Sequence, residues 1–359
     1  MTSSRLRSID LKRSNRRGLV AVSEMLVMLT VLVGLFWAGA QFLLAVTNDP
    51  LSASQASRSC SERGVYRISL DADGRRMWVY RPCNGVSRLD LATGDVEHLP
   101  ASSGRESTAV AHSRDGSTTL LCDADATVSL CRDDEDLRVA RVKVMKDDMI
   151  GDASVSHDGS VSACVTSLGR VFGWFRHASD LREFTYDLPP GAPVFLIKLN
   201  ATGRRLLVFR HDGTVSFHIP ETGEPIGIPL HFGPDCTAVA WSEDECLVGV
   251  FTSNGRARVY DVASGRIACE RTWGTRHCSF KSKFEFSPDG RRIAVTTDLS
   301  KEIQIWNLET GELGQLRGHD GIVRTIQFAR TSDRLYSGSF DGTIREWSLD
   351  TFQQLRVIN

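Results

Sequence analysis

The C-terminal part of the chain contains the stretch GHDGIVRTIQFARTSDRLYSGSFDGTIREWS (Gly318–Ser348). It alternates β-rich runs with tight polar turns, one at Ala329–Ser332 and another at Asp341–Gly342. Asp-Gly is a strong two-residue hairpin signal, because the positive φ angles that these residues tolerate match the twist of the flanking strands. The stretch therefore predicts consecutive antiparallel strands joined by short turns.

The same unit recurs along most of the chain. Its first turn has seven copies: Asp71–Gly74, Ser113–Gly116, Ser156–Gly159, Asn200–Gly203, Ser242–Glu245, Ser287–Gly290 and Ala329–Ser332. Successive copies begin 42, 43, 44, 42, 45 and 42 residues apart, so seven units account for nearly all of residues 61–359. A fixed period of this length indicates a repeat architecture, and the β-rich runs make it all-β.

A second marker begins twelve to fourteen residues after the start of each first turn, and a third follows in several copies. The clearest copies of the second are Asn84-Gly85, Asp212-Gly213, Asn254-Gly255 and Asp341-Gly342. The third is Ala92-Thr93-Gly94, Glu221-Thr222-Gly223, Ala263-Ser264-Gly265 or Glu309-Thr310-Gly311. Three turns divide each unit into four short strands, labelled a to d below.

The last unit resembles the WD-repeat (WD40) family of β-propellers, and the repeat extends that resemblance over about 300 of the 359 residues. Its residues His319, Ser337, Asp341 and Trp347 are similar to the structural tetrad of that family. The resemblance implies that Asp and Ser orient a buried imidazole, which in turn holds the indole N–H. We expect a seven-bladed β-propeller over residues 60–359, closed by packing of the first blade against the last.

A membrane signal precedes the repeat. Residues 25–46 read MLVMLTVLVGLFWAGAQFLLAV, which at 1.5 Å per residue spans about 33 Å as a helix, enough for a bilayer core of about 30 Å. Residues 1–17 carry six basic residues and one acidic residue. The positive-inside rule predicts a basic cytoplasmic tail (1–17), a transmembrane signal-anchor helix (18–46) and a linker (47–59), with the propeller on the extracytoplasmic side.

Other interpretations of this segment stay open. Ala38-Gly39-Ala40 fits a signal-peptidase site before Gln41, although apolar sequence continues to Val46. Arg16-Arg17 matches a loose twin-arginine export pattern. Glu24, just before the apolar run, resembles the acidic residue at the start of pilin-like proteins, which usually falls one residue earlier.

Six of the nine cysteines fall into three candidate disulfide pairs: Cys60 with Cys83, Cys122 with Cys131, and Cys269 with Cys278. Each pair flanks connections that share one face of a propeller, and an exported domain permits disulfides. The alternative is that they are small buried apolar residues. No spacing typical of structural zinc is present, so we expect neither metal nor cofactor.

The sequence lacks the G-x-S-x-G, H-E-x-x-H, P-loop and dinucleotide-binding motifs, so it predicts no catalytic residue. Beyond residue 46 the chain has 37 basic and 42 acidic residues, which argues against nucleic acid as a partner. Trp273, with Arg271, Arg276 and His277, lies in a connection between blades and predicts a protein-contact patch. Packing of Trp273 against the neighbouring blade is the alternative.

The sequence leads to two alternative hypotheses about function. The first is a membrane-anchored, non-catalytic scaffold that binds protein partners, as the WD-repeat resemblance implies. The second is an extracytoplasmic enzyme or small-ligand binder that uses the central channel. The second would require His, Arg and acidic residues at the axis, contributed by several a strands. The a strands read as mainly small and apolar, which favours the scaffold.

Overall fold

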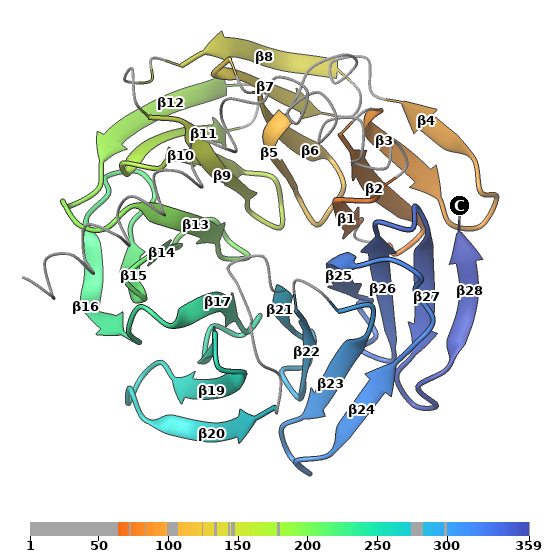
Figure 1. The fold of residues 1–359 in the computed structure, drawn as a ribbon. Helices are drawn as coiled ribbons and strands as arrows, with labels where there is room; N and C mark the ends of the chain where they lie inside the picture. Colours follow the sequence, from red (N-terminus) through yellow and green to blue (C-terminus); the bar gives the residue numbers. More distant parts are fainter. Residues whose placement is uncertain are drawn as a thin grey trace, which may run out of the picture. The chain divides into compact units, whose positions relative to one another are not determined.

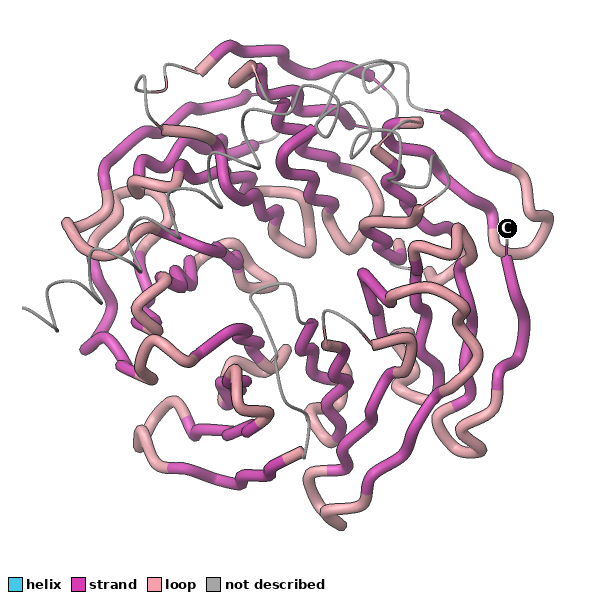
Figure 2. The backbone as a smooth tube through the Cα atoms, viewed as in Figure 1, coloured by secondary structure: helices cyan, strands magenta, loops and turns pink. Residues whose placement is uncertain are grey.

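The computed structural model describes residues 64–71, 73–82, 84–98, 107–123, 125–132, 135–142, 144, 148–177, 180–273, 283–297 and 300–358. Residues 61–359 form one compact unit. In its described part, 28 strands form seven four-stranded antiparallel sheets, each continuous in sequence. Figure 1 shows these sheets as blades around an axis, and Figure 2 shows the described residues as strands and loops. The predicted seven-bladed propeller is confirmed.

The first four blades have the following bounds. Blade one contains β1 (Arg67–Leu70), β2 (Arg76–Arg81), β3 (Gly85–Asp90) and β4 (Val96–His98). Blade two contains β5 (Ser107–His112), β6 (Thr118–Asp123), β7 (Thr127–Arg132) and β8 (Glu135–Arg141). Blade three contains β9 (Ile150–Val155), β10 (Val161–Thr166), β11 (Arg170–His177) and β12 (Asp180–Asp187). Blade four contains β13 (Val194–Leu199), β14 (Leu206–Arg210), β15 (Thr214–His218) and β16 (Pro225–His231).

The remaining three blades repeat this order. Blade five contains β17 (Cys236–Trp241), β18 (Leu247–Thr252), β19 (Arg256–Asp261) and β20 (Ile267–Thr272). Blade six contains β21 (Lys283–Phe286), β22 (Arg292–Thr296), β23 (Ile303–Asn307) and β24 (Leu313–Leu316). Blade seven contains β25 (Val323–Phe328), β26 (Arg334–Ser339), β27 (Ile344–Ser348) and β28 (Gln354–Ile358).

Burial follows the position of a strand within its blade. The second strands β6, β10 and β14 are buried along their whole length, because neighbouring blades cover both of their faces. Their sequences are accordingly rich in apolar residues, as in TTLLCD and LLVFR. The outermost strand β16 is mostly exposed, with Ile228 87% accessible. The first strand of every blade lies nearest the axis (Figure 1).

The turn between the first and second strands explains the recurring Ser-x-Asp-Gly sequence. In blade six the Ser287 hydroxyl donates to Asp289 Oδ1 over 2.5 Å and accepts the amide of Arg292 over 2.9 Å. Gly290 adopts φ 70°, a left-handed conformation that costs glycine little. Equivalent serine–aspartate bonds occur in blades two, three and five. The repeat spacing therefore follows from one self-contained turn.

The first and last blades close the ring directly. The amide of Val65 donates to the Ser339 carbonyl over 2.9 Å, and Arg356 donates from Nη1 to the Leu91 carbonyl over 2.5 Å. Val65 also packs in one apolar cluster with Tyr336 and Ile344 of blade seven. Because β1 and β25 are far apart in sequence, this closure ties the N-terminal and C-terminal parts of the propeller together.

No helix in the described part of the chain is long and apolar enough to cross a membrane. The predicted signal-anchor helix (18–46), the basic tail and the linker all lie outside the described residues.

Candidate functional site

The tetrad predicted from the last unit comes together in blade seven. His319 precedes β25, Ser337 lies on β26, and Trp347 lies on β27. Asp341 Oδ2 lies 2.7 Å from His319 Nδ1, and Ser337 Oγ lies 2.7 Å from His319 Nε2. Trp347 Nε1 donates to Ser337 Oγ over 2.7 Å. The serine hydroxyl therefore joins the indole to the imidazole, whereas the resemblance implied that the imidazole holds the indole directly.

The charges in this network are fixed by its surroundings. Burial raises the pKa of Asp341, but hydrogen bonds from Thr343 and His319 outweigh it and hold that pKa well below its ordinary value. Burial lowers the pKa of His319, more than Asp341 raises it, so the imidazole is neutral at pH 7. Since a carboxylate only accepts, the ring proton belongs on Nδ1, and Ser337 donates to Nε2. The network is structural.

A second cluster lies at the axis, where the first strands meet around a cavity of 630 Å³. Six charged side chains and a histidine on the first strands of six blades line this cavity, together with charged residues of the turns. They are Arg67 on β1, His112 on β5, Asp152 on β9, Lys198 on β13, Lys283 and Glu285 on β21, and Arg324 on β25. The expectation that the first strands leave the axis small and apolar is wrong. Five first strands contribute one or two charged residues each and β5 contributes the histidine, and the closed ring brings them together.

Burial dominates the electrostatics of this axial cluster. It lowers the pKa of Lys198, lowers that of Lys283 to about 8, raises that of Asp152, and raises that of Glu285 to about 7. Burial also lowers the pKa of His112 to about 3, so that ring is neutral at pH 7 and stacks on Trp78. Attraction between the opposite charges of the cluster acts against these pKa shifts, but it is weaker than the effect of removing the groups from water.

The turns between first and second strands carry a bridge across one end of the cavity. Arg114 of blade two lies 2.6 Å from Glu243 of blade five, and His157 of blade three lies 4.0 Å from the same carboxylate. All three residues line the cavity. This end is therefore spanned by side chains.

Comparison with known proteins agrees with this architecture. Residues 311–348, which include the whole tetrad, match the family model "WD domain, G-beta repeat". The last blade is thus a WD40 repeat, and the chain folds as a seven-bladed β-propeller. The fold is similar to the β-propeller domain of Cps50 (Swd1) from Myceliophteria thermophila, with a TM-score of 0.67 and 19% identity over 80% of this chain and 97% of that chain.

Curated relatives match only part of this propeller. The U3 snoRNP-associated protein-like EMB2271 of Arabidopsis thaliana is 29% identical over 32% of this chain and 27% of its own length. The U3 small nucleolar RNA-associated protein 21 homolog of Schizosaccharomyces pombe is 30% identical over 45% and 17%. The human WD repeat and SOCS box-containing protein 1 is 26% identical over 33% and 29%. The chain thus spans less than a third of each relative.

Trp273 is not the exposed anchor of the predicted contact patch. Trp273 follows β20, is 5% exposed, and packs edge-to-face against Phe251 and Trp306 with ring centroids 5.6 Å apart in both pairs. It is a core residue between blades five and six, the alternative that the sequence left open. Arg271 Nη1 donates to the Gly311 carbonyl of blade six. Arg276 and His277 lie outside the described residues.

The predicted disulfide between Cys122 and Cys131 is also wrong. The two side chains occupy different apolar clusters on opposite faces of blade two. Cys122 pairs with Val128 across the sheet and Cys131 pairs with Thr119, so strand alternation points their side chains apart. Cys60, Cys83 and Cys278 lie outside the described residues, so the pair Cys60–Cys83 stays a prediction, whereas the predicted pair Cys269–Cys278 is wrong because the Cys269 thiol is free. Cys269 is a half-buried free thiol.

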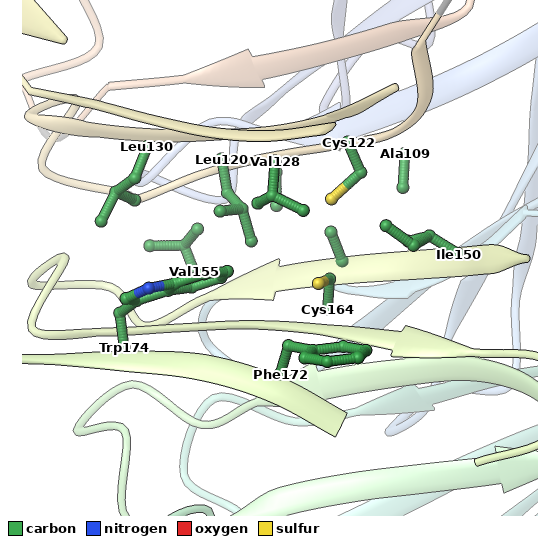
Figure 3. Close-up of a cluster of buried hydrophobic side chains, with 12 residues drawn as sticks. Ala109, Leu120, Cys122, Val128, Leu130, Ile150, Val155, Cys164, Phe172 and Trp174 are labelled. Carbon is green, nitrogen blue, oxygen red and sulfur yellow. The ribbon is translucent and has the colours of Figure 1, made fainter. Parts of the chain in front are cut away.

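Cys122 instead faces Cys164 of blade three (Figure 3). A hydrogen bond with the Cys164 thiol, together with burial, raises the pKa of Cys122 well above its ordinary value. Sequence alone does not indicate this neighbour, because the two residues belong to different blades. Among the described residues, no group of three or more His, Cys, Asp or Glu side chains is placed to hold a metal ion.

Proposed function

We propose that this WD40 propeller is a non-catalytic scaffold that binds protein partners on the face formed by its interblade connections and its turns between second and third strands. WD-repeat propellers generally present rigid loop faces to partners, and the printed names of relatives describe association with other components, as in "U3 snoRNP-associated". The acidic balance of residues 47–359 argues for protein over nucleic acid as the partner class.

One observation on that face supports the proposal. Met149, in the connection into blade three, is 66% exposed, and Leu168, in the β10–β11 turn, is 58% exposed. The amide of Ser167 donates to the Met149 carbonyl over 2.9 Å, so the two apolar residues are neighbours. Two large apolar side chains exposed together on one face are typical of a contact site.

The loops that carry this pair are held in place. Asp148 Oδ1 accepts the Ser167 hydroxyl over 2.6 Å and the Leu168 amide over 3.0 Å. Burial raises the pKa of Asp148, but these bonds outweigh it and keep that pKa below its ordinary value. A contact surface that is already ordered loses little conformational entropy when a partner binds.

The experiment compares two surface variants in the native host. A proximity-labelling enzyme fused to the chain marks its neighbours, and Met149→Asp with Leu168→Asp should reduce labelling of the specific partner about tenfold or more. Ile228→Asp, on the outer edge of blade four, is the matched control because Ile228 is an exposed apolar residue away from this face. Equal labelling by both variants would contradict the proposed contact face.

We further propose that the scaffold is tethered to a membrane with the propeller on the extracytoplasmic side. The support is the 22-residue apolar segment at 25–46 after six basic residues. A reporter that is active only after export, fused to Asn359, should be active. An inactive fusion, with a cytoplasmic reporter active at the same position, would reverse the topology.

A further inference from the structure

The axial cavity has the size and the charge of a site for a small molecule. Its 630 Å³ falls in the range of about 300–1,000 Å³ that is usual for small-ligand sites. The bridge from Arg114 to Glu243 spans one end, so a ligand would enter from the opposite face, which carries the interblade connections. This site is separate from the scaffold role, which uses the outer surface of the loops.

Positive charge is in excess around the cavity. Arg114, Glu243 and Glu245 also line the cavity, but Arg114 is paired with Glu243 and Glu245 with Arg205. Among the remaining charges, Arg67, Lys198, Lys283 and Arg324 stand against two carboxyl groups, Asp152 and Glu285. Within the described part of the chain, no ion pair within 4.0 Å joins these side chains to one another. With burial raising the pKa of Glu285 to about 7, this carboxylate is half protonated at neutral pH, which increases the positive excess further.

The basic groups come from different blades and converge. Arg67 of blade one acts electrostatically on Asp152, Lys198 and Lys283, which belong to blades three, four and six. Its guanidinium therefore lies near the axis. Arg324 Cζ lies over the adjacent rings of Tyr66 and Phe340, 5.7 and 5.5 Å from their centroids, and its buried Nε has no hydrogen-bond acceptor among the described residues.

We propose that the axial cavity binds a small dianion, a dicarboxylate or a phosphate monoester, between Arg67, Lys198 and Lys283. A dianion supplies the two negative charges that the cluster lacks, and its oxygens accept charge-assisted hydrogen bonds from guanidinium and ammonium groups. The two carboxyl groups Asp152 and Glu285 restrict the site to ligands whose anionic oxygens avoid them.

The test uses the full-length chain in a non-ionic detergent, with thermal unfolding and calorimetry. Inorganic phosphate and succinate are the probes, and sodium chloride at matched ionic strength and the dication putrescine are the controls. We expect at least one dianion to raise the melting temperature in a saturable manner, while putrescine and chloride do not. A response to phosphate alone or succinate alone identifies which chemistry the site prefers.

The variants Lys198→Gln and Lys283→Gln should each weaken the binding of the dianion at least tenfold, whereas Lys301→Gln, an exposed lysine in a turn of blade six, should leave it unchanged. Because removing a buried charge can change stability by itself, each variant is compared with its own ligand-free form. The proposal is overturned if neither dianion shifts unfolding beyond chloride, if putrescine binds instead, or if all three variants bind the dianion as the parent does.

Discussion

The indole Nε1 of Trp347 donates to the hydroxyl of Ser337 over 2.7 Å, so this small side chain, and not the imidazole, holds the largest residue in the core of blade seven. Ser337 is fully buried and sits between two ring nitrogens, one that donates to it and one that accepts from it. The network therefore has its centre at the serine. Loss of the Ser337 hydroxyl would leave the Trp347 indole N–H without an acceptor and His319 Nε2 without a donor.

Ser337→Ala should lower the free energy of unfolding by about 1–3 kcal/mol, the cost of leaving buried polar groups unpaired. Ser348→Ala, also in blade seven, removes only an exposed hydroxyl that accepts the Thr351 amide over 3.3 Å and should change stability by less than about 0.5 kcal/mol. Denaturant unfolding of both variants measures the difference. Similar stabilities for the two would contradict a central role for Ser337.

Asp341→Asn should lower stability in a pH-dependent manner. Hydrogen bonds from Thr343 and His319 hold the pKa of Asp341 below its unfolded value of about 3.9. Its contribution is therefore fully present above that unfolded pKa and is lost as the pH falls through the folded pKa. Melting temperatures of the parent and the variant should differ most at pH 7 and converge in acid below about pH 4. A gap that stays constant down to pH 2 would contradict this account.

The parts of the fold that sequence predicts are those built from local bonds. The Ser-x-Asp-Gly turns satisfy their own polar groups within six residues, as Ser287 and Asp289 show, so their spacing gives the blade count directly. The tetrad is predictable for a similar reason, because all four residues lie in one unit. Glu245 and Ser332 occupy the glycine position of their turns at φ 62° and 58°, so even these degenerate copies keep the turn geometry.

The sequence did not predict the contacts between blades. Cys122 was matched to Cys131 in its own blade, but alternation along the strands turns their side chains apart, and its neighbour Cys164 comes from the next blade. The sequence did not indicate the axial cluster, because no first strand carries more than two of its charges. Arg67 and Arg324 become neighbours of the same cavity only when the ring closes. The Trp273 error has the same origin.

Glu285→Gln should stabilise the propeller in neutral and alkaline solution. Burial raises the pKa of Glu285 to about 7, despite the opposing charges of Lys198, Arg114 and Lys283, from an unfolded value of about 4.3. The folded state therefore binds the proton more tightly, and stability falls as the pH rises from about 4.3 to 7. Glutamine mimics the protonated form, so the variant should melt higher than the parent at pH 8 and equally at pH 4. A lower melting temperature at pH 8 would show that ionised Glu285 is stabilised by its neighbours.

The thiols facing each other between blades two and three should be unreactive in the folded protein. Cys122 and Cys164 are fully buried, and the pKa of Cys122 is raised well above its ordinary value, so little reactive thiolate forms. Cys246 is exposed and should react before Cys122 and Cys164. Maleimide labelling followed by peptide mass mapping measures the order. Labelling of Cys122 or Cys164 at the rate of Cys246 without denaturant would contradict the packing in Figure 3.

Gly213→Ala should destabilise blade four far more than Gly265→Ala destabilises blade five. Both glycines have positive φ, 80° and 66°, so alanine is strained at both positions. The two variants therefore differ mainly in how much room there is for the added Cβ. A Cβ at Gly213 would lie 1.9 Å from the Gly233 carbonyl oxygen, whereas one at Gly265 meets nothing within 4 Å. Because the obstacle at Gly213 is backbone, the β14–β15 turn must move away from the segment that follows β16.

Gly265→Ala should cost about 1–2 kcal/mol, the penalty of the left-handed conformation alone, and Gly213→Ala clearly more. Denaturant unfolding at equal protein concentration compares them, and equal losses would mean that the two turns are not packed as the structure shows.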